Sequence, residues 1–159
     1  MKYLNGSDLA GYIKERQARH VANLNKKGVN PKLAIIVTID DPVIEVYLRL
    51  KKKYGTDIGI EVTLFRVDIK EVKNKIKELN LNKEYTGIIV QLPIAKPDLT
   101  DEIANLVKPS KDVDGLSNKT KFHPATPLAI QWLLSGYNVD LNGKEIVLVG
   151  KGRLVGGPL

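Results

Sequence analysis

The chain alternates between short apolar runs and longer segments whose apolar residues recur at helical spacing. The short runs are rich in β-branched residues, as is typical of strands buried in a sheet. They cover 32–39, 60–67, 86–92 and 145–149. The segments with helical spacing cover 7–27, 42–59, 68–79, 100–107 and 126–136. Because strands and helices alternate, the pattern predicts an α/β fold: a three-layer parallel sheet with helices on both faces.

The helix over 42–59 has the clearest boundaries. Asp41 can cap free backbone N–H groups, Pro42 suits the first helical position, and Gly59 is expected to end the helix. Its apolar residues include Val43, Val46, Tyr47 and Leu50. By the same reasoning Asp68, Thr100 and Thr126 are expected to cap the three later helices.

Two domains are expected. Residues 1–125 contain a complete set of layers, whereas 126–159 contain a linker helix, one strand and a glycine-rich loop that should open a helix. A dinucleotide-binding fold needs several βα units. We therefore expect 126–159 to be the beginning of a truncated Rossmann-like domain.

Composition excludes several classes of protein. The 159 residues include no cysteine, so disulfides and thiolate metal sites are excluded, and His20 and His123 are too scattered to suggest a metal. No apolar run is long enough for a signal peptide or a membrane span, which favours a cytoplasmic protein. The net charge of +7 lies mainly on lysines of helical segments without interleaved aromatic residues, so nucleic-acid binding is a minor alternative.

Several motifs, in order, resemble the methylenetetrahydrofolate dehydrogenase/cyclohydrolase family. They cover 40–42, 47–51, 90–93, 111–115, 124–127 and 149–156. The resemblance implies one-carbon metabolism that serves purine biosynthesis: oxidation of 5,10-methylenetetrahydrofolate with NAD(P), then hydrolysis of the methenyl form to 10-formyltetrahydrofolate. It also implies a homodimer at full length. This chain is expected to lack the dehydrogenase step and to self-associate.

Tyr47 and Lys51 are the first candidate pair. Four residues apart on one helix, their side chains share a face. A lysine acts as a base only when burial or neighbouring cations lower its pKa, and Arg49, Lys52 and Lys53 supply nearby charge. The resemblance implies that Lys51 handles protons during hydrolysis while Tyr47 packs on the substrate's aminobenzoyl ring.

The second candidate segment is Val90-Gln91-Leu92-Pro93, at the end of a predicted buried strand. A polar amide in such a place must find hydrogen-bond partners. The resemblance implies that Gln91 bonds to the lysine and to the folate, and that its neighbours Val90, Leu92 and Pro93 help to bind substrate.

Asp112 and Asp114 precede Gly115, and both could simply belong to a turn. A carboxylate can also accept two hydrogen bonds from the amino-pyrimidine edge of a pterin. The resemblance places that role on Asp114 and leaves Asp112 as local scaffold.

Gly150, Lys151 and Gly152 begin the glycine-rich loop and are the candidate cofactor contacts. Backbone N–H groups in a loop between a strand and a helix favour phosphate, although the spacing is not the common dinucleotide fingerprint. Lys151 stands where the family has arginine, which leaves the choice between NAD and NADP open. A non-catalytic α/β module that binds folate or an acidic partner is the alternative to an enzyme.

Overall fold

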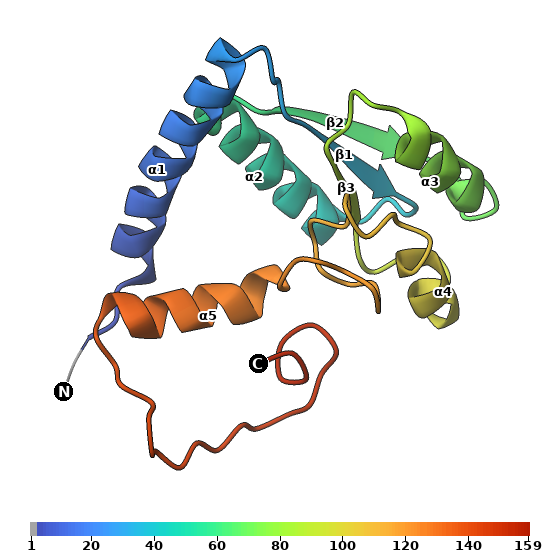
Figure 1. The fold of residues 1–159 in the computed structure, drawn as a ribbon. Coiled ribbons are helices and arrows are strands. Elements are labelled where there is room, and N and C mark those ends of the chain that lie inside the picture. The colour runs from blue at the N-terminus through green and yellow to red at the C-terminus, as the bar shows by residue number, and fades with distance from the viewer. Residues whose placement is uncertain (1–2) are drawn as a thin grey trace.

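A computed structural model describes residues 3–159 and has the expected α/β architecture (Figure 1). The helices are α1 (Gly6–Lys26), α2 (Pro42–Ile58), α3 (Val72–Leu81), α4 (Thr100–Ala104) and α5 (Ala125–Gly136), with a 3-10 turn η1 (Pro97–Leu99). The strands are β1 (Lys32–Val37), β2 (Glu61–Arg66) and β3 (Gly87–Val90).

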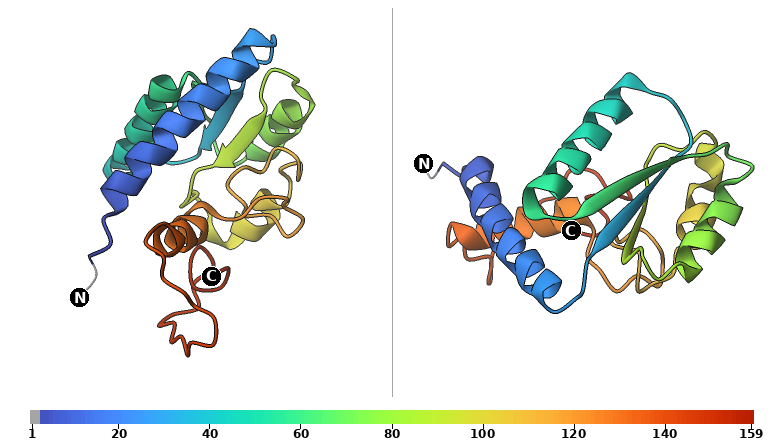
Figure 2. Two further views of the ribbon diagram at one scale, coloured as in Figure 1. Left: turned by 60° about the vertical axis from the view of Figure 1, so that its left-hand side comes forward. Right: turned by 90° about the horizontal axis from the view of Figure 1, so that it is seen from above.

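The three strands form one parallel sheet in the order β2-β1-β3. Successive residues of β1 face opposite sides, and each side has its own core. Ala34 and Ile36 pack with residues of α3 and α4, whereas Ile35 and Val37 pack with Ile44 and Leu48 of α2. Figure 2 shows α2 on one face and α3 with α4 on the other. The prediction of helices on both faces is therefore confirmed.

Helix α2 follows its local sequence closely at both ends. The Asp41 side chain accepts hydrogen bonds from the backbone N–H groups of Val43 and Ile44, and Gly59 caps the far end at φ 82°. The face toward the sheet consists of Ile44, Leu48, Gly55 and Ile58. The other apolar residues form an outward stripe that is exposed to solvent: Val43, Val46, Tyr47, Leu50 and Tyr54.

The capping predictions for the later helices were wrong. Asp68 accepts from the backbone N–H of Lys70 in a turn, and α3 begins only at Val72. Thr100 and Thr126 already lie inside α4 and α5, whose caps are Leu99 and Pro124. A capping side chain needs an extended residue directly before the first turn. Asp68 lies too far before α3, whereas Thr100 and Thr126 are already helical.

Residue Gly87 begins β3 at a crowded place. A Cβ atom there would lie 3.0 and 3.1 Å from the two γ-methyl groups of Val113 and 3.2 Å from a methyl of Leu33. The segment before Asp114 therefore lies close against the sheet, and Ile88 forms an isolated parallel bridge with Asp112.

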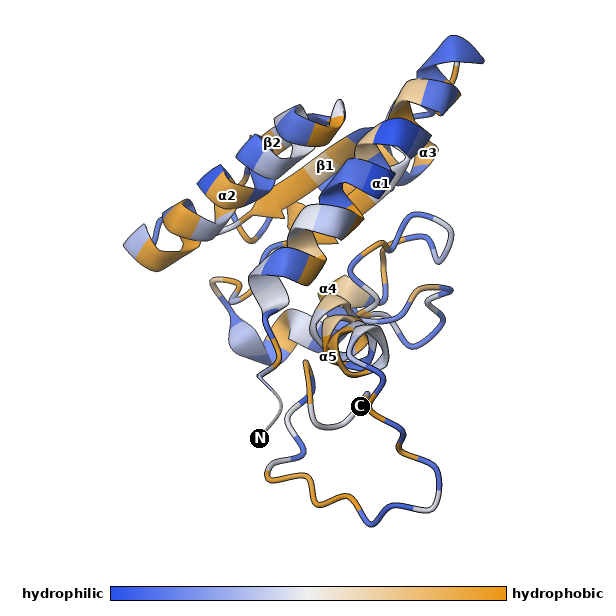
Figure 3. Ribbon diagram, turned by 90° about the vertical axis from the view of Figure 1, so that its left-hand side faces the viewer, coloured by the Kyte–Doolittle hydropathy of each residue, from blue (hydrophilic) through white to orange (hydrophobic). Residues whose placement is uncertain are grey.

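The expected strand at 145–149 is absent: these residues are irregular, and 153–158 form turns where a helix was expected. A strand needs a neighbour for its backbone groups, and no strand of the described sheet lies beside this segment. Figure 3 shows the apolar residues of this tail on a long excursion away from the sheet. Within residues 3–159, no helix is long and apolar enough to cross a membrane.

Candidate active site

The amino group of Lys51 meets the side chain of Gln91 at the edge of the sheet. Lys51 Nζ, on α2, donates to Gln91 Oε1 over 2.8 Å. Gln91 directly follows β3 and is held on both sides: its backbone N–H donates to Ile36 O over 2.9 Å, and its Nε2 donates to Leu92 O over 2.7 Å. The amide is therefore fixed before any ligand binds, and it fixes the lysine in turn.

Burial lowers the pKa of Lys51 below its ordinary value of 10.5, while the negative charge of Asp114 opposes that change. Burial raises the pKa of Asp114 above 3.8; the charge of Lys51 lowers it, and that of Asp112 raises it further. Both groups are therefore shifted toward their neutral forms. A lysine that can lose its proton beside a carboxylate that can keep one is suited to proton transfer.

Asp112 holds the turn that presents Asp114. Its carboxylate, 3% exposed, accepts from the backbone N–H groups of Gly115, Leu116 and Ser117 at 3.1, 3.4 and 2.9 Å. Gly115 has φ 71°, and a Cβ atom there would lie 2.8 Å from Pro124 N. Only glycine fits this position, which explains the Asp-Val-Asp-Gly order in structural terms.

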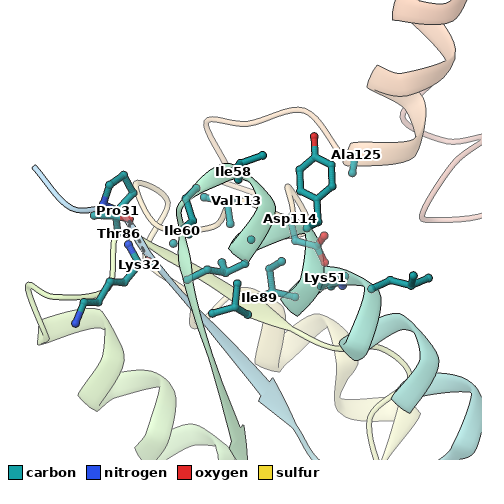
Figure 4. Close-up of a pocket in the computed structure, with 16 residues that line it drawn as sticks. Pro31, Lys32, Lys51, Ile58, Ile60, Thr86, Ile89, Val113, Asp114 and Ala125 are labelled. Atoms are coloured by element: carbon teal, nitrogen blue, oxygen red, sulfur yellow. Dashed lines mark hydrogen bonds between the residues drawn. The ribbon is translucent and has the colours of Figure 1, made fainter. Parts of the chain in front are cut away.

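A cavity of about 570 Å³ lies next to Lys51 and Asp114, on the α2 face of the sheet (Figure 4). Lys51 and Asp114 both line it, and Figure 4 shows their side chains close together at one end. The other walls are mostly apolar, with Leu33, Ile89 and Val113 among them. An apolar cavity with a few convergent polar groups is the usual form of a small-molecule site.

The other predicted substrate residues lie differently. Tyr47 is 55% exposed on the outward stripe of α2 and does not line the cavity. Val90 is buried in the core between the sheet and α3. Leu92 is half-buried, and Pro93 is exposed after a cis peptide bond. The structure thus brings Lys51, Gln91 and Asp114 together and leaves Tyr47 exposed, outside the cavity lining.

Tyr54 lines the cavity and was missed by the sequence analysis. It lies three residues after Lys51 on α2, so helical spacing from the lysine could have identified it. Its hydroxyl donates to Gln17 Oε1 over 2.7 Å, which ties this wall of the cavity to α1.

The glycine-rich loop lies against the Asp114 turn, although the two are distant in sequence. Arg153 Nη2 donates to Leu116 O over 2.9 Å, and the same guanidinium pairs with Asp101 of α4. Gly150, Lys151 and Gly152 are exposed. They are open to a phosphate, but no ordered helix follows them. No cluster of three or more potential metal ligands occurs within residues 3–159.

Comparisons with known proteins give a consistent result. The family model for "Tetrahydrofolate dehydrogenase/cyclohydrolase, catalytic domain" matches residues 4–114. The chain is 37% identical to the bifunctional protein FolD of Aquifex aeolicus, over 98% of this chain and 59% of that protein. The crystal structure of the Campylobacter jejuni FolD enzyme superposes with a TM-score of 0.95 at 32% identity, over 99% of this chain and 61% of the other.

A third similar structure is the Trypanosoma brucei FolD enzyme, solved with NADP and an inhibitor. It has a TM-score of 0.90 at 25% identity, over 99% of this chain and 59% of the other. The chain thus spans about 60% of the length of these relatives. Because the model of the catalytic domain matches residues 4–114, the chain belongs to the tetrahydrofolate dehydrogenase/cyclohydrolase family.

Proposed function

We propose that this chain binds a tetrahydrofolate and hydrolyses 5,10-methenyltetrahydrofolate to 10-formyltetrahydrofolate, as part of one-carbon metabolism. The observation that carries the proposal is the convergence of Lys51, Gln91 and Asp114. The three come from α2, the end of β3 and the 111–115 turn, and two of them line one cavity. Family membership supports the same reaction class.

In this proposal Asp114 orients the substrate. A carboxylate accepts hydrogen bonds from the amino-pyrimidine edge of a pterin, and the Asp112 scaffold holds Asp114 in place for that contact. Tyr47, which is exposed one turn before Lys51 on α2, covers the aminobenzoyl ring after the substrate has entered. Leu92 and Pro93 border the same edge of the sheet.

Lys51 handles the proton. Hydrolysis adds water to the methenyl carbon, releases one proton and breaks one of the two carbon–nitrogen bonds. Burial favours the neutral amine, which can accept that proton. The Gln91 Oε1 acceptor fixes the direction of Nζ, so the amine is positioned before substrate arrives.

The nicotinamide-dependent oxidation belongs to the longer relatives, and we propose that the 159-residue chain alone does not perform it. Bound NAD(P) would accept a hydride from the methylene group of the folate. Here Gly150, Lys151 and Gly152 could contact only a phosphate, because irregular residues flank them where a strand and a helix would position a dinucleotide. We expect the chain to form no NADPH from methylenetetrahydrofolate. Robust NADPH formation would contradict the proposal that the chain alone does not perform the oxidation.

Titration calorimetry with 5-formyltetrahydrofolate tests the folate proposal. We expect weak binding by the chain, and Asp114→Asn should weaken it by more than ~1 kcal/mol, the scale of a lost charge-assisted hydrogen bond. Asp98→Asn is the matched control, because Asp98 is exposed on η1, outside the cavity. Equal affinity for the parent and Asp114→Asn would remove Asp114 from the site.

A further inference from the structure

A second hollow lies where α1 meets α5, away from the Lys51 cavity. Its volume is about 470 Å³. Three side chains on successive turns of α1 line one wall: Tyr12, Arg16 and His20. Trp132 and Ser135 of α5 line the opposite wall. Among residues 3–159 no carboxylate lines the hollow, whereas the Arg16 guanidinium contributes a positive charge.

Hydrogen bonds fix the walls of this hollow. The hydroxyl of Tyr137 accepts from the backbone N–H of Asn5 over 2.9 Å and donates to Asn5 O over 3.3 Å, which joins the end of α5 to the start of α1. Further along α1, Gln17 also lines the hollow and accepts from Tyr54 of α2. One end of the hollow and its α1 wall are therefore held in place without a ligand, which reduces the ordering cost of binding.

The lining combines exposed aromatic rings with cationic groups that have no internal partner. Trp132 is 42% and Tyr12 is 62% exposed. Within residues 3–159, the side chains of Arg16 and His20 form no hydrogen bond and no ion pair. An indole presents a face for stacking, and a guanidinium offers a planar fork of donors to a carboxylate or phosphate.

We propose that this hollow is a second binding site, for a small planar aromatic ligand that carries a negative charge. The ring lies against Trp132, with Tyr12 at its edge, and the anion binds Arg16, with a ring N–H of His20 as a further donor. This arrangement could not be read from the sequence, because Trp132 and Arg16 are more than one hundred residues apart. The site is independent of the folate proposal, since the two sets of lining residues do not overlap.

The single tryptophan of the chain makes the test direct, because all indole fluorescence comes from Trp132. Adenosine 5'-monophosphate is the probe, since it combines a planar ring with a phosphate. We expect saturable quenching by this probe and at least about tenfold weaker quenching by adenosine, which lacks the charge. Inorganic phosphate, which lacks the ring, should bind as weakly as adenosine.

Arg16→Met should weaken binding of the probe at least about tenfold, the scale of a lost charge-assisted contact. The matched control is Arg19→Met, because Arg19 is exposed on the same helix but does not line the hollow. Lys151→Met should also leave binding unchanged, which separates this site from the glycine-rich loop. Ser135→Leu fills the hollow without changing charge and should abolish the quenching.

Three results would overturn the proposal: no saturable quenching at millimolar probe, equal affinity for adenosine and its monophosphate, or unchanged affinity in both Arg16→Met and Ser135→Leu. Circular dichroism of each variant shows whether it is folded. None of these outcomes depends on whether the chain binds folate, because the calorimetric test with 5-formyltetrahydrofolate addresses the other cavity.

Discussion

The buried carboxylate of Asp112 accepts a hydrogen bond from the backbone N–H of Ser117 over 2.9 Å, across the turn that carries Asp114. Two further backbone N–H groups of the same turn donate to this carboxylate. One side chain thus satisfies a whole turn, including groups that are buried and would otherwise lack partners. Asp112 therefore stabilises the turn that positions Asp114.

Asp112→Asn should destabilise the chain by about 1–3 kcal/mol, because the amide loses the charge and one acceptor oxygen while the donors remain buried. Urea denaturation measures the change. Asp98→Asn removes the same charge from an exposed residue and should have almost no effect. If the two variants were equally stable, Asp112 would not be the scaffold of the turn.

Asp114→Asn should raise stability near neutral pH even though it weakens folate binding. The folded-state pKa of Asp114 lies above its unfolded value, so the group favours folding at low pH and loses that contribution as pH rises through the folded pKa. The neutral amide avoids the cost of a buried charge. Its advantage should therefore be present at about pH 7 and shrink below about pH 4, where the parent carboxyl is protonated.

Denaturation of the parent and Asp114→Asn at both pH values checks this expectation. A variant less stable than the parent at neutral pH would mean that attraction to Lys51 outweighs the burial of the carboxylate.

Lys51→Met should abolish hydrolysis of methenyltetrahydrofolate while changing folate affinity little, because the thioether keeps the stem of the side chain but cannot accept a proton. Absorbance of the methenyl form follows the reaction. Lys52→Met, at an exposed neighbouring position, is the control. A parent chain that binds folate without hydrolysing the methenyl form would support the non-catalytic alternative.

The apolar tail should make the chain self-associate. Val147 and Val149 are 81% and 99% exposed in an irregular segment outside the described sheet, and such an exposed apolar segment invites pairing with another chain. We expect light scattering to show an average mass that rises with concentration. Val149→Lys should reduce that rise, whereas Val29→Lys, at an exposed valine after α1, should not. A concentration-independent monomer would contradict the expectation.

Features set by neighbouring residues could be predicted from the sequence. The Asp41–Pro42 start, the Gly59 stop and the buried run of β1 are examples, because capping and burial of a central strand depend on local chemistry. The strand at 145–149 could not be judged in this way, since a strand forms only beside a partner. The exposure of the outward stripe of α2 could not be predicted for a related reason. The helix has two apolar faces, and only the tertiary fold decides which face packs on the sheet.

For the candidate site, the resemblance to a known family identified the candidate residues, and the structure showed which of them lie close together. Lys51 and Gln91 are forty residues apart, and their hydrogen bond exists because α2 packs on the sheet and carries Lys51, in the middle of the helix, to the carboxyl end of β3. Tyr54 was missed because no family motif marked it, although it lines the same cavity. The roles of these side chains in binding and hydrolysis stay predictions until the variants are measured.

The absence of a side chain at Gly87 determines how closely the turn that carries Asp114 approaches the sheet. Nothing at position 87 separates the sheet from Val113, so the residue next to Asp114 rests directly on β3. In Gly87→Ala the added methyl group would push Val113 away from the sheet. The turn would then move, and Asp114 would change its position relative to Lys51 although neither residue is altered. The position of the Asp114 carboxylate thus depends on the lack of a Cβ atom at Gly87, which lies at the start of β3, whereas Gln91 follows its end.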